Sequence, residues 1–85
     1  MANRTKAFRN GHRDPNGIIY STQRTGDTIY ADAYDPADDS MSSAHFKFDP
    51  DTGSHEVVPG TLDLHPDHAK KDVGRVMRRI VNSNF

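Results

Sequence analysis

Three polar residues in the second half of the chain have the types that acid–base chemistry on RNA requires. His55 and Glu56 are adjacent, and Lys47 is predicted to oppose Glu56 across a β-hairpin. A metal-independent RNase needs a general base, a general acid and cations that bind phosphate. The Lys47–Glu56 pair is explained equally well as an outward pair of opposite charges. Since the chain has no Gly-rich phosphate loop, G-x-S-x-G motif or cysteine, we expect no catalytic residues and rank a small RNase last of three hypotheses.

Two stretches have the residue types of metal sites. Residues 49–53, DPDTG, resemble the start of a calcium loop, but the twelfth position is Gly60 and the flanks are predicted strands, which favours a tight hairpin turn. His65 and His68 are three residues apart, but no standard zinc pattern supplies the remaining ligands. We therefore predict that the protein binds neither a metal nor another cofactor.

Tyr30, Asp32 and Tyr34 alternate along a predicted strand and therefore share one of its faces. Exposed tyrosines anchor many protein interfaces and can also stack on bases. The alternative is that the N-terminal arm or a second copy of the chain covers them. Together with Asp38 and Asp39 in the following polar loop, these residues are the predicted contact with a protein partner. We rank this non-enzymatic binding first, in the role of an inhibitor, an adaptor or a nucleic-acid mimic.

Basic residues gather at the two ends of the chain and predict the second hypothesis, nucleic-acid binding. Affinity for a phosphate backbone depends on cations spread over one surface. An N-terminal arm and one side of a C-terminal helix would supply them. The candidate contacts are Arg4, Lys6, Arg9, Arg13, Lys71, Arg75, Arg78 and Arg79. A solvated helix surface is the simpler interpretation of the last four.

Charge is strongly segregated along the sequence, although the net charge is only −1. Residues 1–25 hold five bases and one acid (+4), residues 26–67 hold one base and ten acids (−9), and residues 68–85 hold five bases and one acid (+4). Such asymmetry is typical of a surface used for association. The acidic middle would repel a nucleic acid if it shared the basic surface.

Composition indicates one small domain. The 85 residues are 33% hydrophobic, with no cysteine and no tryptophan, so the core is small and a homodimer would add stability. No apolar run approaches the roughly 20 residues of a membrane span, and the N-terminus has no signal-peptide core. We therefore expect a cytoplasmic protein without a membrane partner.

The clearest helical period covers residues 66–82. Pro66 suits a first helical position, and Gly74 suggests close approach of a strand. An apolar stripe opposes the basic side of this helix. The stripe consists of Ala69, Val73, Val76, Met77, Ile80 and Val81.

Two hairpins precede the helix. In residues 17–35 a Thr25-Gly26 turn would place Tyr20 opposite Ala31, with alternate residues facing the core. Residues 36–43 are a predicted polar loop. In residues 44–58, pairing Phe48 with His55 also aligns Lys47 with Glu56, and residues 61–65 are predicted to be extended.

These elements predict an α+β fold, a β-meander of about four antiparallel strands with one amphipathic helix on one face. Residues 1–16 would be a flexible basic arm and residues 17–85 the single domain. In outline, and in the turn at residues 49–53, this predicted topology is similar to the small arm-binding domains of phage-type integrases. The predicted core is Ile18, Tyr20, Ile29, Ala31, Ala33, Phe46, Phe48, Val57, Leu62, Leu64, Val73, Val76, Met77 and Ile80.

Overall fold

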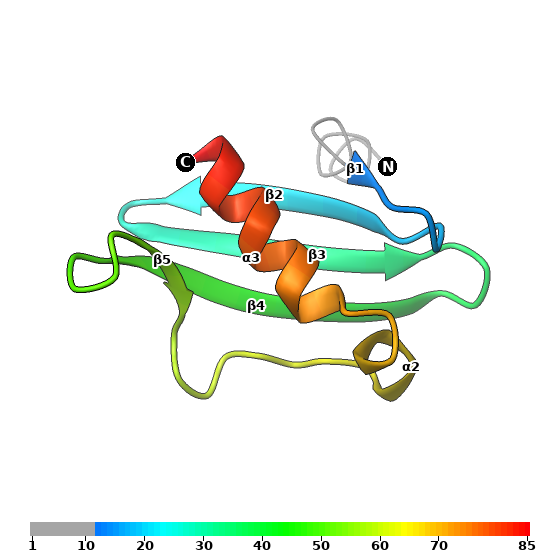
Figure 1. Cartoon of the computed structure of the whole chain (residues 1–85). Helices are drawn as coiled ribbons and strands as arrows, with labels where there is room; N and C mark the ends of the chain where they lie inside the picture. The colour runs from blue at the N-terminus through cyan, green and yellow to red at the C-terminus, as the bar shows by residue number, and fades with distance from the viewer. Residues whose placement is uncertain (1–11) are drawn as a thin grey trace.

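An antiparallel sheet with one helix across a single face forms the protein, as the computed structural model shows for residues 12–85 (Figure 1). The strands lie in chain order: β1 (His12–Arg13), β2 (Ile19–Thr25), β3 (Thr28–Asp35), β4 (Ser40–Asp49) and β5 (Ser54–Val57). Helices α2 (Pro66–Ala69) and α3 (Val73–Asn84) follow. The predicted α+β meander with a C-terminal helix is therefore confirmed.

The short strand β1 lies within the segment that was expected to be an arm. His12 and Arg13 pair with Tyr20 and Ile19 of β2. Asp14 closes the following turn by accepting the backbone N–H groups of residues 16 and 18. Residues 12–16 therefore belong to the sheet edge, and the rest of the predicted arm lies outside the described residues.

The β2–β3 register differs by two residues from the prediction, because the turn is Gly26-Asp27. Gly26 has φ +63°, a conformation that suits glycine at the first turn position and would strain Thr25. Tyr20 consequently pairs with Ala33. A shift of two residues keeps each side chain on its face, so the predicted core and outer faces of this hairpin are correct.

Strand β4 begins at Ser40, whereas residues 40–43 were predicted to be loop. Burial alternates through this segment, with Ser42 buried and Met41 exposed. The sequence did not show this alternation because serine is polar and was interpreted as a loop residue. A buried serine hydroxyl needs a hydrogen-bond partner, and the sequence does not reveal that partner. The β4–β5 register is as predicted, with Phe48 opposite His55 and Lys47 opposite Glu56.

The core lies between the sheet and α3. Its buried members are Ile18, Tyr20, Ile29, Ala31, Ala33, Ala44, Phe46, Val73, Met77, Ile80 and Val81, with Val57, Leu64 and Val76 packed at its edge. Phe48 and Leu62 were wrongly placed in the core, since they are 56% and 47% exposed. Phe48 is next to the last residue of β4 and contacts the ring of His55 edge-on. Leu62 adjoins a single β-bridge at Asp63 rather than a strand.

The predicted helix over residues 66–82 is two helices. The chain breaks at Asp72, whose φ of 56° is left-handed, so α2 and α3 have different axes. Pro66 does begin α2 as predicted. Gly74 is the second residue of α3, and a Cβ there would meet nothing within 4 Å, so the predicted close approach is wrong. The break lets His68 of α2 enter the interior.

Candidate functional site

The sheet face opposite α3 carries no other described element (Figure 1). Residues paired across an antiparallel sheet point to the same side. Register therefore aligns Ser21 of β2, Asp32 of β3 and Ser43 of β4 in one row across this open face. Asp63 extends the row, because it bridges Ser43 through two backbone hydrogen bonds. The row alternates carboxyl groups with small hydroxyl side chains.

Larger side chains stand on both sides of this row. Tyr30 pairs with His45, and their ring centroids are 4.3 Å apart. On the other side Tyr34 pairs with Met41. Tyr30 is 41% exposed and Met41 54% exposed, so apolar surface remains in contact with water. The small row is therefore the floor of a shallow trough.

A hollow of about 340 Å³ opens where the trough meets the Tyr30–His45 pair. It is lined by Gln23, Thr25, Tyr30, Ala31, Asp32, Ser43, Ala44 and His45. Asp32 is half-buried and has no hydrogen bond or ion pair to another residue of the described part of the chain. Burial raises the pKa of the Asp32 carboxyl, and the nearby His45 offsets part of this effect.

The two loop aspartates predicted with this group have local partners. Asp39 accepts the hydroxyl hydrogen of Tyr34, which ties the loop to the edge of the open face. Asp38 accepts from the backbone and hydroxyl of Ser40, and these hydrogen bonds lower the pKa of Asp38. The structure thus brings Tyr30, Asp32 and Tyr34 together and puts Asp38 and Asp39 beside them.

The sequence patterns did not predict three members of this surface, which are His45, Ser43 and Asp63. The β3–β4 register brings His45 to Tyr30, and the assignment of residues 36–43 as loop concealed that register. An alternating pattern continued upstream from Phe46 would have found Ser43 and His45.

The sequence patterns also did not predict a series of hydrogen-bonded polar side chains beside the β3–β4 loop. His68 is fully buried, and its Nδ1 and Nε2 lie 2.6 Å and 2.7 Å from the hydroxyls of Ser42 and Ser40. Ser42 accepts the backbone N–H of His65, and Ser40 contacts Asp38 at 2.5 Å. This series joins α2 to β4 and to the loop that holds Asp38.

The cations predicted on the C-terminal helix divide into two kinds. Lys71, in the link between α2 and α3, pairs with Asp35 at 3.3 Å, and Arg78 binds both carboxylate oxygens of Glu56 at 2.8 Å. These two cations therefore form ion pairs within the folded protein. Arg75 has only an exposed contact of 3.4 Å with Asp72, the residue before α3. Arg79 is exposed and has no ion pair among residues 12–85.

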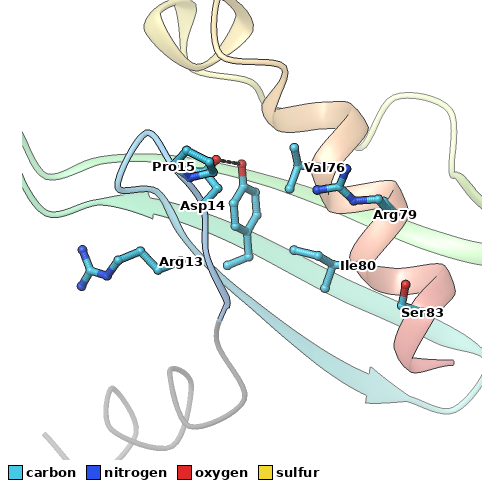
Figure 2. Close-up of a pocket in the computed structure, with 8 residues that line it drawn as sticks. Arg13, Asp14, Pro15, Val76, Arg79, Ile80 and Ser83 are labelled. Carbon is cyan, nitrogen blue, oxygen red and sulfur yellow. Dashed lines mark hydrogen bonds between the residues drawn. The ribbon is translucent and has the colours of Figure 1, made fainter.

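Arg79 also borders a second hollow, of about 300 Å³, between α3 and the turn that follows β1 (Figure 2). Its floor includes Tyr20, whose hydroxyl donates to Asp14 at 2.8 Å. Burial and the Asp14 carboxylate raise the pKa of this hydroxyl, and Arg79 opposes the shift. Figure 2 shows Arg13 extending away from α3, so the two arginines do not converge. The remaining predicted cations, Arg4, Lys6 and Arg9, lie outside the described residues.

The groups proposed for an RNase are engaged in structural contacts. Arg78 and Ser54 hold Glu56 and lower its pKa to about 2, so this carboxylate is a weak base at neutral pH. Glu56 therefore pairs with Arg78 rather than with Lys47. The backbone and ring of His55 bind the side chain of Asn82.

Among residues 12–85, no three His, Asp or Glu side chains are grouped so that they could hold a metal ion. No helix of the described chain is long and apolar enough to cross a membrane. Comparisons with models of known protein families, with curated proteins and with solved structures find no match.

Proposed function

We propose that the protein is a non-enzymatic binding module whose open sheet face docks onto a positively charged surface of a protein partner. The observation that carries this proposal is Asp32, a half-buried carboxylate that makes no ion pair with residues 12–85 and lies on a sheet face that no other described element covers. Exposed Tyr30 and Met41 flank it. Aromatic residues and methionine are enriched in protein interfaces, and a desolvated carboxylate favours a cationic partner.

Charge also argues against two other occupants of this face. In a homodimer that packs open face against open face, the carboxylates of Asp32 and Asp63 would approach those of the second copy, and opposed like charges are destabilising. The same carboxylates would repel a phosphate backbone. A partner with lysine or arginine at its surface has neither difficulty.

Capture from a native lysate by immobilised protein tests the interface when matched variants are compared. Met41→Glu and Tyr30→Ala should each lose a partner that the unmodified protein captures, because a buried glutamate or a missing aromatic anchor costs an interface about 2 kcal/mol or more. Phe48→Glu is the control, since Phe48 is 56% exposed, like Met41, but lies outside the trough. Retention of the partner by Met41→Glu, or its equal loss with Phe48→Glu, would contradict the proposal.

Nucleic-acid binding by α3 is the second candidate, and the positions of Arg75 and Arg79 favour it. Both are exposed on α3, whereas Asp32 is on the opposite face of the sheet. A groove of about 620 Å³ lies beside them and has no carboxylate in its lining. The lining residues are Ser54, Arg75, Arg78, Arg79, Asn82 and Ser83. The acidic row on the far side need not approach a bound phosphate backbone.

Titration with short duplexes at low and moderate salt tests this candidate. Reversing both charges, Arg75→Glu with Arg79→Glu, should weaken binding strongly and reduce the magnitude of the slope of log K against log salt by about 2. Lys47→Glu is the control, because Lys47 is exposed on β4 and does not line this groove. Absence of binding at low salt would remove the candidate. Loss of binding when the charges of Asp32 and Asp38 are reversed would instead indicate that the acidic surface makes the contact.

A further inference from the structure

We infer that the hollow beside Tyr30, Asp32 and His45 is a pocket for an arginine side chain of the partner. This inference rests on the proposed function and specifies its central contact. The hollow of about 340 Å³ lies where the short side chain of Ser43 is paired with Asp32 and the larger side chains of Tyr30 and His45 border it. A single side chain from a docking surface can enter a hollow of this kind.

The electrostatics of the pocket select a cation. Asp32 has no hydrogen bond or ion pair with any residue of the described range 12–85, and burial raises the pKa of its carboxyl. Among the described residues the ionised carboxylate is therefore desolvated, and the nearby His45 offsets only part of this cost. Asp63 adds a second negative charge at the end of the same row. His45 is the titratable side chain that faces Asp32, and Lys47 is one pair farther along β4.

The shape of the pocket favours guanidinium over ammonium. The tilted Tyr30 and His45 rings form one wall, against which a planar guanidinium can stack. From that position it can donate two parallel hydrogen bonds to the Asp32 carboxylate. A guanidinium is also more weakly hydrated than an ammonium group, so its transfer from water into the pocket is less costly.

An NMR titration of the isotopically labelled protein tests the pocket with N-acetyl-arginine amide, N-acetyl-lysine amide and N-acetyl-citrulline amide. Arginine should produce saturable shifts at residues 30, 32 and 45, lysine weaker ones, and the uncharged citrulline none. Asp32→Asn should weaken arginine binding about tenfold or more, because it removes the charge from two charge-assisted hydrogen bonds. Asp51→Asn, in the exposed β4–β5 turn, should change nothing.

Thermal melting gives a second readout that needs no ligand. Because the folded protein holds the Asp32 proton more tightly than the unfolded chain does, the ionisation of Asp32 lowers stability as pH rises above about 4. Asp32→Asn should therefore raise the melting temperature at about pH 7 and leave it unchanged near pH 3, where both states are protonated. Asp51→Asn should have no such effect.

Three results would contradict the proposal that the hollow binds arginine. The first is equal binding of the citrulline and arginine probes. The second is the absence of a saturable shift on the open face up to about 100 mM arginine probe, a concentration far above a millimolar dissociation constant, and the third is a lower melting temperature for Asp32→Asn at neutral pH. If the arginine probe fails to bind while Met41→Glu still loses the partner, the proposed arginine pocket is wrong but the proposed protein interface on the open face is supported. If arginine binds but Met41→Glu keeps the partner, the protein interface is wrong and the pocket binds a guanidinium compound independently.

Discussion

Replacing His68 with alanine is expected to lower the free energy of unfolding by about 3 kcal/mol, because it removes two buried hydrogen bonds and leaves a cavity. His68 is completely buried and touches the hydroxyls of Ser40 and Ser42. For a domain of this size, such a loss lowers the melting temperature by about 15 °C. Among the polar side chains of the described residues, this one has the largest predicted effect on stability.

With a neutral His68 ring, one assignment of hydrogens satisfies every contact from Asp38 to His65. The Asp38 carboxylate only accepts, so the Ser40 hydroxyl donates to it and accepts the proton on Nε2 of His68. Nδ1 of the neutral ring then accepts from the Ser42 hydroxyl, which itself accepts the backbone N–H of His65. This direction leaves Ser40 without a proton to give to His68, so the histidine does not activate the serine as a nucleophile.

Urea denaturation of His68→Ala, Ser42→Ala and the double variant measures the effect. Ser42→Ala should cost about 1–2 kcal/mol, and the double variant should cost less than the sum, because both changes break the same hydrogen bond. Hydrogen exchange should show the first loss of protection in residues 58–72. If His68→Ala changes the free energy of unfolding by less than about 1 kcal/mol, the hydrogen bonds around His68 do not stabilise the protein.

Replacing Asn82 with alanine is expected to cost about 2 kcal/mol and to cause self-association. Strand β5 is the last strand of the sheet, so its outer edge has no neighbouring strand among residues 12–85. Asn82 of α3 occupies that edge at His55, accepting from its N–H at 2.6 Å and donating to its carbonyl at 3.0 Å. The side-chain amide thus replaces the backbone of a sixth strand, and its removal exposes a pairing edge.

Sedimentation velocity at two protein concentrations, together with urea denaturation, measures both effects. Asn82→Asp should be intermediate, because a carboxylate still accepts from the His55 N–H but cannot donate to its carbonyl. Ser83→Ala is the control, since Ser83 is the exposed next residue of the same helix. A monomeric Asn82→Ala protein with unchanged stability would show that the edge is protected in another way.

The faces of the strands and of α3 can be predicted from the order of the amino acids alone. Alternation in Ile29, Ala31 and Ala33 predicts a core face even when the turn is misplaced by one residue and the register therefore by two, because the strand period is two. The β4–β5 register follows from the turn at residues 49–53. The apolar stripe of α3 likewise depends only on the helical period. Tyr30, Asp32 and Tyr34 could be assigned to one outer face for the same reason.

Which charged and polar groups have partners depends on how the folded elements are arranged in space. Lys71 finds Asp35, 36 residues away, and Arg78 finds Glu56, 22 residues away, whereas Asp32 finds no cation in the described chain. The burial of His68 depends on the break at Asp72 and on two serines of β4. Periodicity arises from backbone geometry within a few residues, so it can be recognised locally. Ion pairs and buried hydrogen bonds depend on distances between segments remote in the chain, and those distances exist only once the chain has folded.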